Sequence, residues 1–368
     1  MEPLDIFKFW EDDAVAHEDN CFSPHAKQAA LGIRMSGECV LSELGEPGDP
    51  WAEMPVEKKA ELYRKYNDKA EKTVGIRLLP ETFKPADAAF PHVKRIGEVF
   101  GGRYFFYNNT EWLEGNVHSA QELEKILDRV DKLDLRGFMF PENWESECQR
   151  IYEKYGILPD RHRHIRGPVT LACSIMSIED LIFLIVDEPE LAKRFSDTIA
   201  NVIIKMTDIM DTYSKTWDLE YFSFADDNCC MLNPEMYEFF GLPVLLKVFE
   251  RYCPNGGMRY QHSDSAMAHL LPLLSKAKLT GVNFGPTVLV DEIRKHLPNA
   301  RIDGCMAPYT FMNNDREKIV FEVRRDCEMA KPTRGLNVFT AGSINYGSSL
   351  ESMKLVMQTI QNYGRYEQ

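Results

Sequence analysis

Two short polar clusters in the sequence have residue types that can carry out acid–base or metal chemistry. Asp226–Asn228 directly follows the apolar run Tyr221–Ala225, and His262–Asp264 directly follows Met258–Gln261. A histidine and an aspartate two residues apart can bind one metal ion or form a hydrogen-bonded acid–base couple. A nearby carboxylate can orient a substrate or stabilise developing positive charge. The candidate catalytic residues are Asp226, Asp227 and His262, and the candidate metal ligands are His262, Asp264 and Cys305.

Both clusters also have a purely structural explanation. Adjacent residues in a strand point to opposite faces, so only one of Asp226 and Asp227 can face a cavity, and one could cap a helix that begins near Pro234. His262 could be a hydrogen-bonded core histidine, with Asp264 as the cap of the helix that follows it. Two acids that close an apolar run need water or a partner, which favours a functional role for the aspartates.

Other polar residues follow or precede the remaining apolar runs. Cys305 could supply a thiolate ligand, although inert burial is commoner for cysteine. The cluster His162–Arg166 contains arginines that could hold a carboxylate. Because it precedes the predicted strand Val169–Cys173, we expect it on the face opposite the active site or in a surface loop. The candidate substrate-binding residues are Asn228, Asn283, Asn345 and Tyr346.

Strands and helices must alternate to position these residues. Apolar or β-rich runs predict nine strands for eight barrel positions, and segments with helical periodicity lie between most of them. Such alternation indicates a parallel sheet, and the absence of GxGxxG and GxxxxGK[ST] motifs favours a barrel over a doubly wound sheet. The predicted strands are Val74–Leu79, Arg103–Tyr107, Gly137–Phe140, Val169–Cys173, Tyr221–Ala225, Met258–Gln261, Leu279–Phe284, Arg301–Ile302 and Leu336–Thr340.

The clearest predicted helix runs from Glu188 to about Lys215, where apolar residues recur at spacings of three and four. Ser177 and Asp180 have the spacing of a capping box at the start of a shorter helix. The other predicted helices are Val56–Glu71, Pro234–Tyr252, Ser265–Lys276, Val290–His296, Arg316–Met329 and Leu350–Tyr363.

Several motifs in order carry a family resemblance. Gly167–Ala172, the Asp226-Asp227 strand end with Asn233–Pro243, Tyr260–Asp264, Gly304–Pro308, Thr340–Ile344 and Tyr363–Tyr366 resemble the uroporphyrinogen decarboxylase superfamily. That superfamily also contains corrinoid-dependent methyltransferases. The resemblance implies an α/β fold, a (β/α)8 TIM barrel whose site lies at the carboxyl ends of its strands. The first 70 or so residues are irregular and carry turn signals, so we expect residues 1–70 to form an N-terminal extension packed on a barrel of residues 71–368.

The resemblance is closer to the methyltransferases than to true uroporphyrinogen decarboxylases. The latter carry an RQAGRY-like segment near the N-terminus, whereas this chain has Arg34–Gly37 there. The zinc methyltransferases have H-x-C near His262 and a further cysteine near the last strand; this chain has Asp264 and Gly342-Ser343 at those places. A site with two thiolates is therefore disfavoured, but an oxygen-rich site could still hold zinc as a Lewis acid.

The resemblance implies an enzyme that moves a methyl group from a small methylated substrate, such as an aryl methyl ether, to a corrinoid. The chain has no D-x-H-x-x-G corrinoid signature, so the corrinoid would arrive on a partner protein. The first alternative is a cofactor-free decarboxylase or lyase in which Asp226 or Asp227 stabilises a cationic intermediate. The second is a ligand-binding barrel without catalytic activity.

Composition and charge bear on the binding partners and the location of the protein. The 368 residues carry a formal net charge of −14 without a long basic stretch, which argues against nucleic acid. The start lacks a signal-peptide pattern and no apolar run is long enough to span a membrane, so we expect a cytoplasmic protein. Nine cysteines without a CxxC pair indicate reduced thiols. The family resemblance also implies a homodimer.

Overall fold

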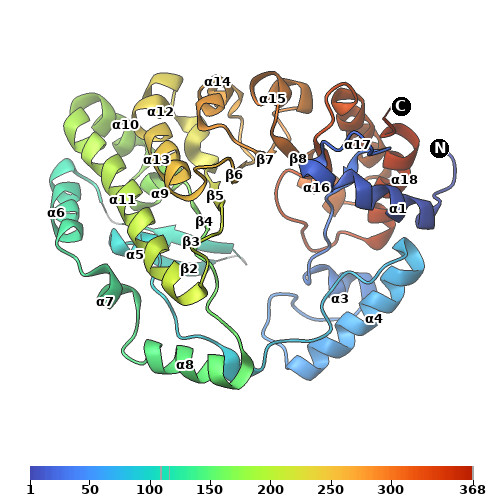
Figure 1. Ribbon diagram of the computed structural model, residues 1–368, viewed down its shortest axis with the longest axis horizontal. Coiled ribbons are helices and arrows are strands. Elements are labelled where there is room, and N and C mark those ends of the chain that lie inside the picture. The colour runs from blue at the N-terminus through green and yellow to red at the C-terminus, as the bar shows by residue number, and fades with distance from the viewer. Residues whose placement is uncertain (108–109, 116, 367–368) are drawn as a thin grey trace. The chain divides into compact units, whose positions relative to one another are not determined.

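The computed structural model describes residues 1–107, 110–115 and 117–366. These residues divide into two compact units, each built from several chain segments (Figure 1). The first unit comprises Met1–Phe83, Ser263–Ala268 and Gly281–Gln368, and the second comprises Lys84–His262 and His269–Thr280.

Three parallel strands form the centre of the second unit: β4 (His164–Arg166), β5 (Tyr221–Ala225) and β6 (Met258–Ser263). Their register aligns His164 with Ser223 and Tyr260, and Arg166 with Ala225 and His262. Residues aligned in this way, and residues two apart along one strand, share a face of the sheet. His164, Arg166 and His262 therefore belong to one face.

An antiparallel hairpin, β2 (Arg103–Tyr107) and β3 (Thr110–Glu114), also belongs to the second unit. Its exit is held against the end of helix α9 (Pro168–Ile175), where the Gly115 amide donates a hydrogen bond to the Ser174 carbonyl at 2.7 Å. A Cβ on Gly115 would lie 2.2 Å from the Ile175 carbonyl oxygen, so this close approach requires glycine.

The first unit has four parallel strands, which pair in the order β1, β9, β8, β7. The two-residue strand β1 comes from the N-terminal region, and the Leu31 amide within it donates a hydrogen bond to Asp13 Oδ1 at 2.7 Å. The strands of this unit are β1 (Ala30–Leu31), β7 (Gly281–Phe284), β8 (Arg301–Met306) and β9 (Leu336–Thr340).

Helices alternate with these strands along the chain. In the second unit α13 packs on β5 and on the long helix α11, as Figure 1 shows in green and yellow. The helices of this unit are α5 (Ile96–Val99), α6 (Ala120–Asp131), α7 (Leu135–Met139), α8 (Trp144–Tyr155), α9, α10 (Ile178–Asp187), α11 (Pro189–Ser214), α12 (Pro234–Phe240), α13 (Leu242–Tyr252) and α14 (Leu271–Leu274). Those of the first unit are α1 (Ile6–Ala16), α2 (Glu18–Cys21), α3 (Cys39–Leu44), α4 (Val56–Val74), α15 (Val290–His296), α16 (Pro308–Met312), α17 (Arg316–Ala330) and α18 (Leu350–Tyr363).

The predicted strands from Tyr221 onward are confirmed, but four earlier ones need correction. Val169–Cys173 lies in helix α9, because Pro168 at the first helical position and a capping carboxylate from another strand favour a helix there. Gly137–Phe140 falls largely in helix α7, and Val74–Leu79 begins at the last residue of α4 and is otherwise irregular. Arg103–Tyr107 is a strand, but it pairs in the hairpin and not in the parallel set.

Most predicted helices are also confirmed. α11, α15 and α18 match their predicted ranges closely, and Ser177 Oγ accepts a hydrogen bond from the Asp180 amide at 3.0 Å to cap α10. The predicted helix Pro234–Tyr252 is divided at Gly241 into α12 and α13. The predicted helix Ser265–Lys276 is replaced by short 3-10 turns and the four-residue helix α14.

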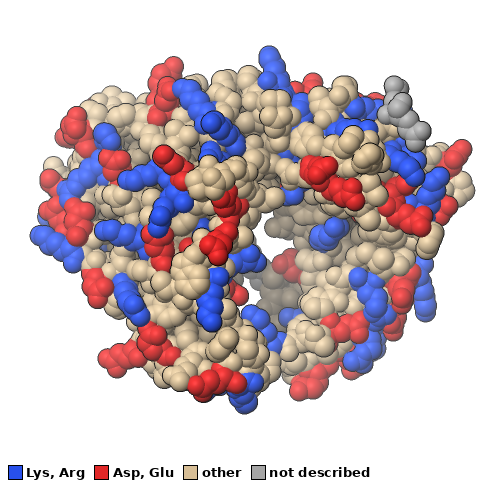
Figure 2. Space-filling model, in the orientation of Figure 1, with Lys and Arg blue, Asp and Glu red and all other residues tan. Residues whose placement is uncertain are grey.

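On the face seen in Figure 2, acidic and basic side chains are interspersed. Among the described residues, none of the helices is both long and apolar enough to cross a membrane.

Candidate functional site

The carboxyl ends of β5 and β6 bring Asp227 and His262 together. Asp227 begins a short 3-10 turn (Asp227–Met231) directly after β5, and His262 lies at the end of β6. The Oδ1 atom of Asp227 is 3.5 Å from His262 Nε2, and the two side chains are 39% and 22% exposed. This pair is therefore close enough to share a ligand and open enough to reach one.

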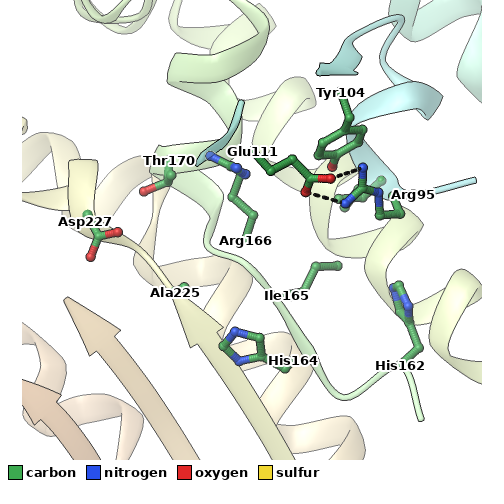
Figure 3. Close-up of a pocket in the computed structure, with 11 residues that line it drawn as sticks. Arg95, Tyr104, Glu111, His162, His164, Ile165, Arg166, Thr170, Ala225 and Asp227 are labelled. Carbon is green, nitrogen blue, oxygen red and sulfur yellow. Dashed lines mark hydrogen bonds and ion pairs between the residues drawn. The ribbon is translucent and has the colours of Figure 1, made fainter. Parts of the chain in front are cut away.

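A cavity of about 350 Å³ lies beside this pair in the second unit (Figure 3). His164 is part of its lining, and its Nδ1 atom is 2.8 Å from Ser223 Oγ. Burial, and secondarily the nearby His262, lower the pKa of His164. The lining residues are Arg95, Ile96, Tyr104, Glu111, His162, His164, Ile165, Arg166, Thr170, Ala225 and Asp227.

Two arginines in this cavity have different partners. Arg95 makes two hydrogen bonds to the Glu111 carboxylate, at 2.5 and 3.0 Å, and its guanidinium carbon lies 3.4 Å from the centre of the Tyr104 ring. Arg166 donates to Ser174 Oγ at 3.3 Å. Figure 3 shows Arg95 and Glu111 joined on one side of the cavity and Asp227 at the other.

The side chain of Asp226 is buried in the protein, where it contacts the start of helix α9. It is fully buried, and its Oδ1 atom accepts a hydrogen bond from the Thr170 amide at 2.7 Å, in the first turn of α9. A Cβ on Gly167 would lie 2.3 Å from the Asp226 side chain, so glycine is needed where the two segments meet. Burial raises the pKa of Asp226 to about 7. The capping role considered from the sequence thus applies to α9, while Asn233 caps α12 by accepting from the Met236 amide at 2.8 Å.

Asn228 lies outside the first cavity but lines a second one of about 580 Å³ in the same unit. That cavity is also lined by Glu111, Arg166 and Thr170, so the two cavities share a wall. The side chains around Asn228 include Cys173, whose pKa burial raises to about 12. An uncharged thiol, and not a thiolate, is therefore expected beside Asn228.

The other predicted site residues belong to the first unit. Asn283 is buried and donates hydrogen bonds to the backbone carbonyls of Asp303 and Thr340, a structural arrangement. Cys305 is fully buried, and burial raises the pKa of its thiol far above its ordinary value. Tyr346 is exposed, and its ring centre is 5.9 Å from that of Trp51.

Asp264 and Asn345 are the remaining predicted site residues of the first unit. Asp264 is exposed, and a Cβ on Gly342 would lie 3.8 Å from its Oδ2 atom. The last-strand position at which the resembling zinc enzymes carry cysteine is thus close to Asp264 within this unit. Asn345 accepts a hydrogen bond from Cys39 Sγ through its carbonyl oxygen, at 3.3 Å.

His164 and Arg166 are functional candidates that we had expected on the face opposite the active site or in a surface loop. Their segment is itself strand β4, so Arg166 lies at the carboxyl end of a strand, where active-site residues of such folds lie. Gly167-Pro168 directly after Arg166 was the available signal, because a proline at the start of a helix marks the end of the preceding strand.

The comparisons with known proteins agree with this architecture. The family model Uroporphyrinogen decarboxylase (URO-D) matches residues 164–363, more than half of the chain. A solved structure, a methyltransferase from Methanosarcina mazei, is similar with a TM-score of 0.52 and 16% sequence identity over 93% of this chain and 95% of that one. No curated protein matched the chain. These matches confirm the predicted α/β barrel class, with a region that precedes the family domain. The chain belongs to the uroporphyrinogen decarboxylase family.

Proposed function

We propose that this protein is a methyltransferase that moves a methyl group from a small methylated substrate to a corrinoid carried by a partner protein. An aryl methyl ether is one such substrate. The observation that carries the proposal is the pair of Asp227 and His262, 3.5 Å apart at the ends of neighbouring strands beside a cavity. Family membership and the similarity in fold to a methyltransferase support it.

The donor set suits a divalent metal such as zinc. An imidazole nitrogen and a carboxylate oxygen are ordinary zinc ligands, and both are partly exposed in this pair. We assign Asp264 as the third ligand, because it follows His262 by two residues and replaces the cysteine of the resembling enzymes. Cys305, the other candidate ligand, is fully buried in the first unit. Such a metal would supply Lewis-acid polarisation of the oxygen that the methyl group leaves.

The side chains of the cavity would hold the substrate in position. In the proposed reaction the bond between the methyl carbon and its oxygen breaks, the electron pair stays on the oxygen, and the oxygen then takes up a proton. Arg95, Glu111 and Tyr104 form a rigid wall, because the double hydrogen bond and the stacked ring fix one another. The corrinoid on the partner protein would supply the nucleophile.

The first experiment measures metal content and methyl transfer together. We expect the purified protein to carry about one equivalent of zinc, and His262→Ala or Asp227→Ala to lower zinc affinity at least about tenfold. Methyl transfer to free cob(I)alamin, followed by its absorbance, should fall with it. His92→Ala is the matched control, because His92 is 69% exposed and lies outside the cavity. Metal below about a tenth of an equivalent, with full activity in His262→Ala, would reject the metal site.

Decarboxylation is the second candidate, and one observation favours it: Arg166 lines the cavity, where it could hold a carboxylated substrate. The matching family is named for a decarboxylase. In that case Asp227 would stabilise positive charge that develops on the substrate. The two functions are distinguished by products. Carbon dioxide released from a carboxylated substrate without cobalamin would establish decarboxylation and reject methyl transfer.

A further inference from the structure

Arg166 is a partly buried guanidinium without a carboxylate within ion-pair distance among the described residues. Its hydrogen-bond partner is the neutral hydroxyl of Ser174. Taking a cation partly out of water is costly unless an opposite charge or a set of hydrogen bonds compensates it. Arg166 faces two cavities, and a ligand in either could provide that charge.

The other shielded arginines of the same unit show how unusual this is. Arg163 pairs with Asp211 at 2.5 Å, and Arg95 pairs with Glu111. Arg259 has no acidic partner, but its guanidinium donates three hydrogen bonds to backbone carbonyls. Arg166 has neither kind of compensation, so its charge is available to a ligand.

The surroundings favour one negative charge and not two. Arg95 is neutralised by Glu111, so it adds no net charge to the cavity. The Thr170 amide at the start of α9, which could otherwise bind a phosphate, already donates to Asp226. Asp227 on the same lining would repel a dianion. One guanidinium with two parallel donors matches a carboxylate.

The strand register gives the distance between this charge and the proposed reaction centre. Ala225 on β5 lies between Arg166 and His262 in the aligned row. Neighbouring strands are about 4.8 Å apart, so the two Cα atoms are separated by about 10 Å on one face of the sheet. A small molecule can therefore reach Arg166 with one end and the Asp227–His262 pair with the other.

We propose that Arg166 binds a carboxylate of the substrate, so that the methyl donor is a methylated carboxylic acid held between Arg166 and His262. The position of the methyl group rests on the proposed function, whereas carboxylate binding by Arg166 does not. The recognition would consist of a bidentate, charge-assisted hydrogen bond at one end of the cavity.

The test measures binding by isothermal titration calorimetry on the full-length protein, without a corrinoid protein. The probes are methoxyacetate and 4-methoxybenzoate, each compared with its amide. We expect at least one acid to bind about tenfold or more tightly than its amide, a ratio that corresponds to about 1.4 kcal/mol. Arg166→Gln should bring that acid within about twofold of its amide, and the preference of the wild type should persist in the presence of a chelator.

Arg161→Gln is the matched control, because Arg161 is exposed, lies in the preceding loop and undergoes the same change of charge. It should keep the acid preference. Circular dichroism and the melting temperature check the fold of Arg166→Gln. If that variant is unfolded, Arg166→Lys, which keeps the charge and loses the bidentate geometry, should still weaken acid binding without changing the amide.

Equal affinity for both acids and their amides in the wild type would overturn the proposal, as would a preference that survives Arg166→Gln. Clearly tighter binding of 4-methoxyphenyl phosphate than of 4-methoxybenzoate would overturn the assignment to a carboxylate. Acid preference without methyl transfer would reject the proposed function and retain this inference. Methyl transfer with no acid preference would do the reverse.

Discussion

Asp226 and Asp227 are neighbours in the chain with opposite surroundings. Asp226 is fully buried against the first turn of α9, whereas Asp227 is partly exposed beside His262. The alternation of side chains at the end of a strand separates them, because consecutive residues there point to different sides. We therefore assign Asp226 a structural role and reserve the chemistry for Asp227.

Substitution of Asp226 tests this division. Asp226→Ala leaves the buried Thr170 amide without an acceptor and should lower the free energy of unfolding by about 1–3 kcal/mol, measured by urea denaturation. Asp226→Asn keeps an oxygen acceptor and should stay within about 1 kcal/mol of the wild type. Loss of turnover in a stable Asp226→Asn variant would contradict the assignment and return Asp226 to the catalytic set.

At the scale of elements, helix α9 connects the strand ends to the hairpin. Its start receives Asp226 from the end of β5, and its end receives the Gly115 amide from the exit of β3. The hairpin supplies Tyr104 and Glu111 to the cavity wall, so the position of that wall depends on the contact between β3 and α9. Backbone packing thereby controls the shape of a binding site.

A side chain at Gly115 should disturb this contact. Gly115→Ala would place a Cβ 2.2 Å from the Ile175 carbonyl oxygen, and we expect a loss of about 1–3 kcal/mol in the free energy of unfolding together with weaker binding of 4-methoxybenzoate. The comparison variant is Gly137→Ala in α7, where the nearest atom is the Asp134 carboxylate at 2.7 Å, which can rotate away. Equal stability of the two variants would show that the hairpin adjusts freely.

At the scale of the whole chain, the two ends of the sequence meet within the first unit. Asp12 in α1 accepts a hydrogen bond from Arg365 at 2.6 Å and lies 3.4 Å from Lys27. The Glu2 amide donates to Asn362 Oδ1 at 2.8 Å, and β1 pairs with β9. The N-terminal segment thus contributes strand β1 to this unit, and its buried Asp12 carboxylate pairs with the partly exposed Arg365 and the exposed Lys27. Figure 1 marks the two chain ends close to α1 and α18.

The ion pair between the chain ends should make stability depend on pH. Burial alone would raise the pKa of Asp12, but the pairs with Arg365 and Lys27 hold it below its ordinary value. A lowered carboxyl pKa stabilises the folded state at neutral pH, and this stabilisation is lost as the pH falls through the folded-state pKa. Asp12→Asn should therefore cost about 1–3 kcal/mol at pH 7 in urea denaturation, with the difference from wild type shrinking in strong acid.

Glu11→Gln is the control for this experiment, because Glu11 lies exposed in the same helix. It should unfold like the wild type at every pH. A constant difference between Asp12→Asn and the wild type down to the acid limit would mean that the charge of Asp12 does not carry its contribution.

The strands β5, β6, β8 and β9 and the long helix α11 could be predicted from the sequence, because each has a strong local pattern of apolar residues. It also identified Asp227 and His262 separately, as polar residues at strand ends. The motifs were sufficient for the family, which the family model confirms over residues 164–363.

Which polar residues lie close together depends on long-range contacts. Val169–Cys173 is rich in β-forming residues, yet it is helical because its capping carboxylate comes from Asp226, more than fifty residues later. Because Val169–Cys173 is helical, Arg166 lies at the carboxyl end of β4 and not on the face opposite the active site or in a surface loop, where we expected it. The register of three parallel strands then set Arg166, Ala225 and His262 in one row. Such long-range pairing leaves no local periodicity, so a single sequence could not predict it.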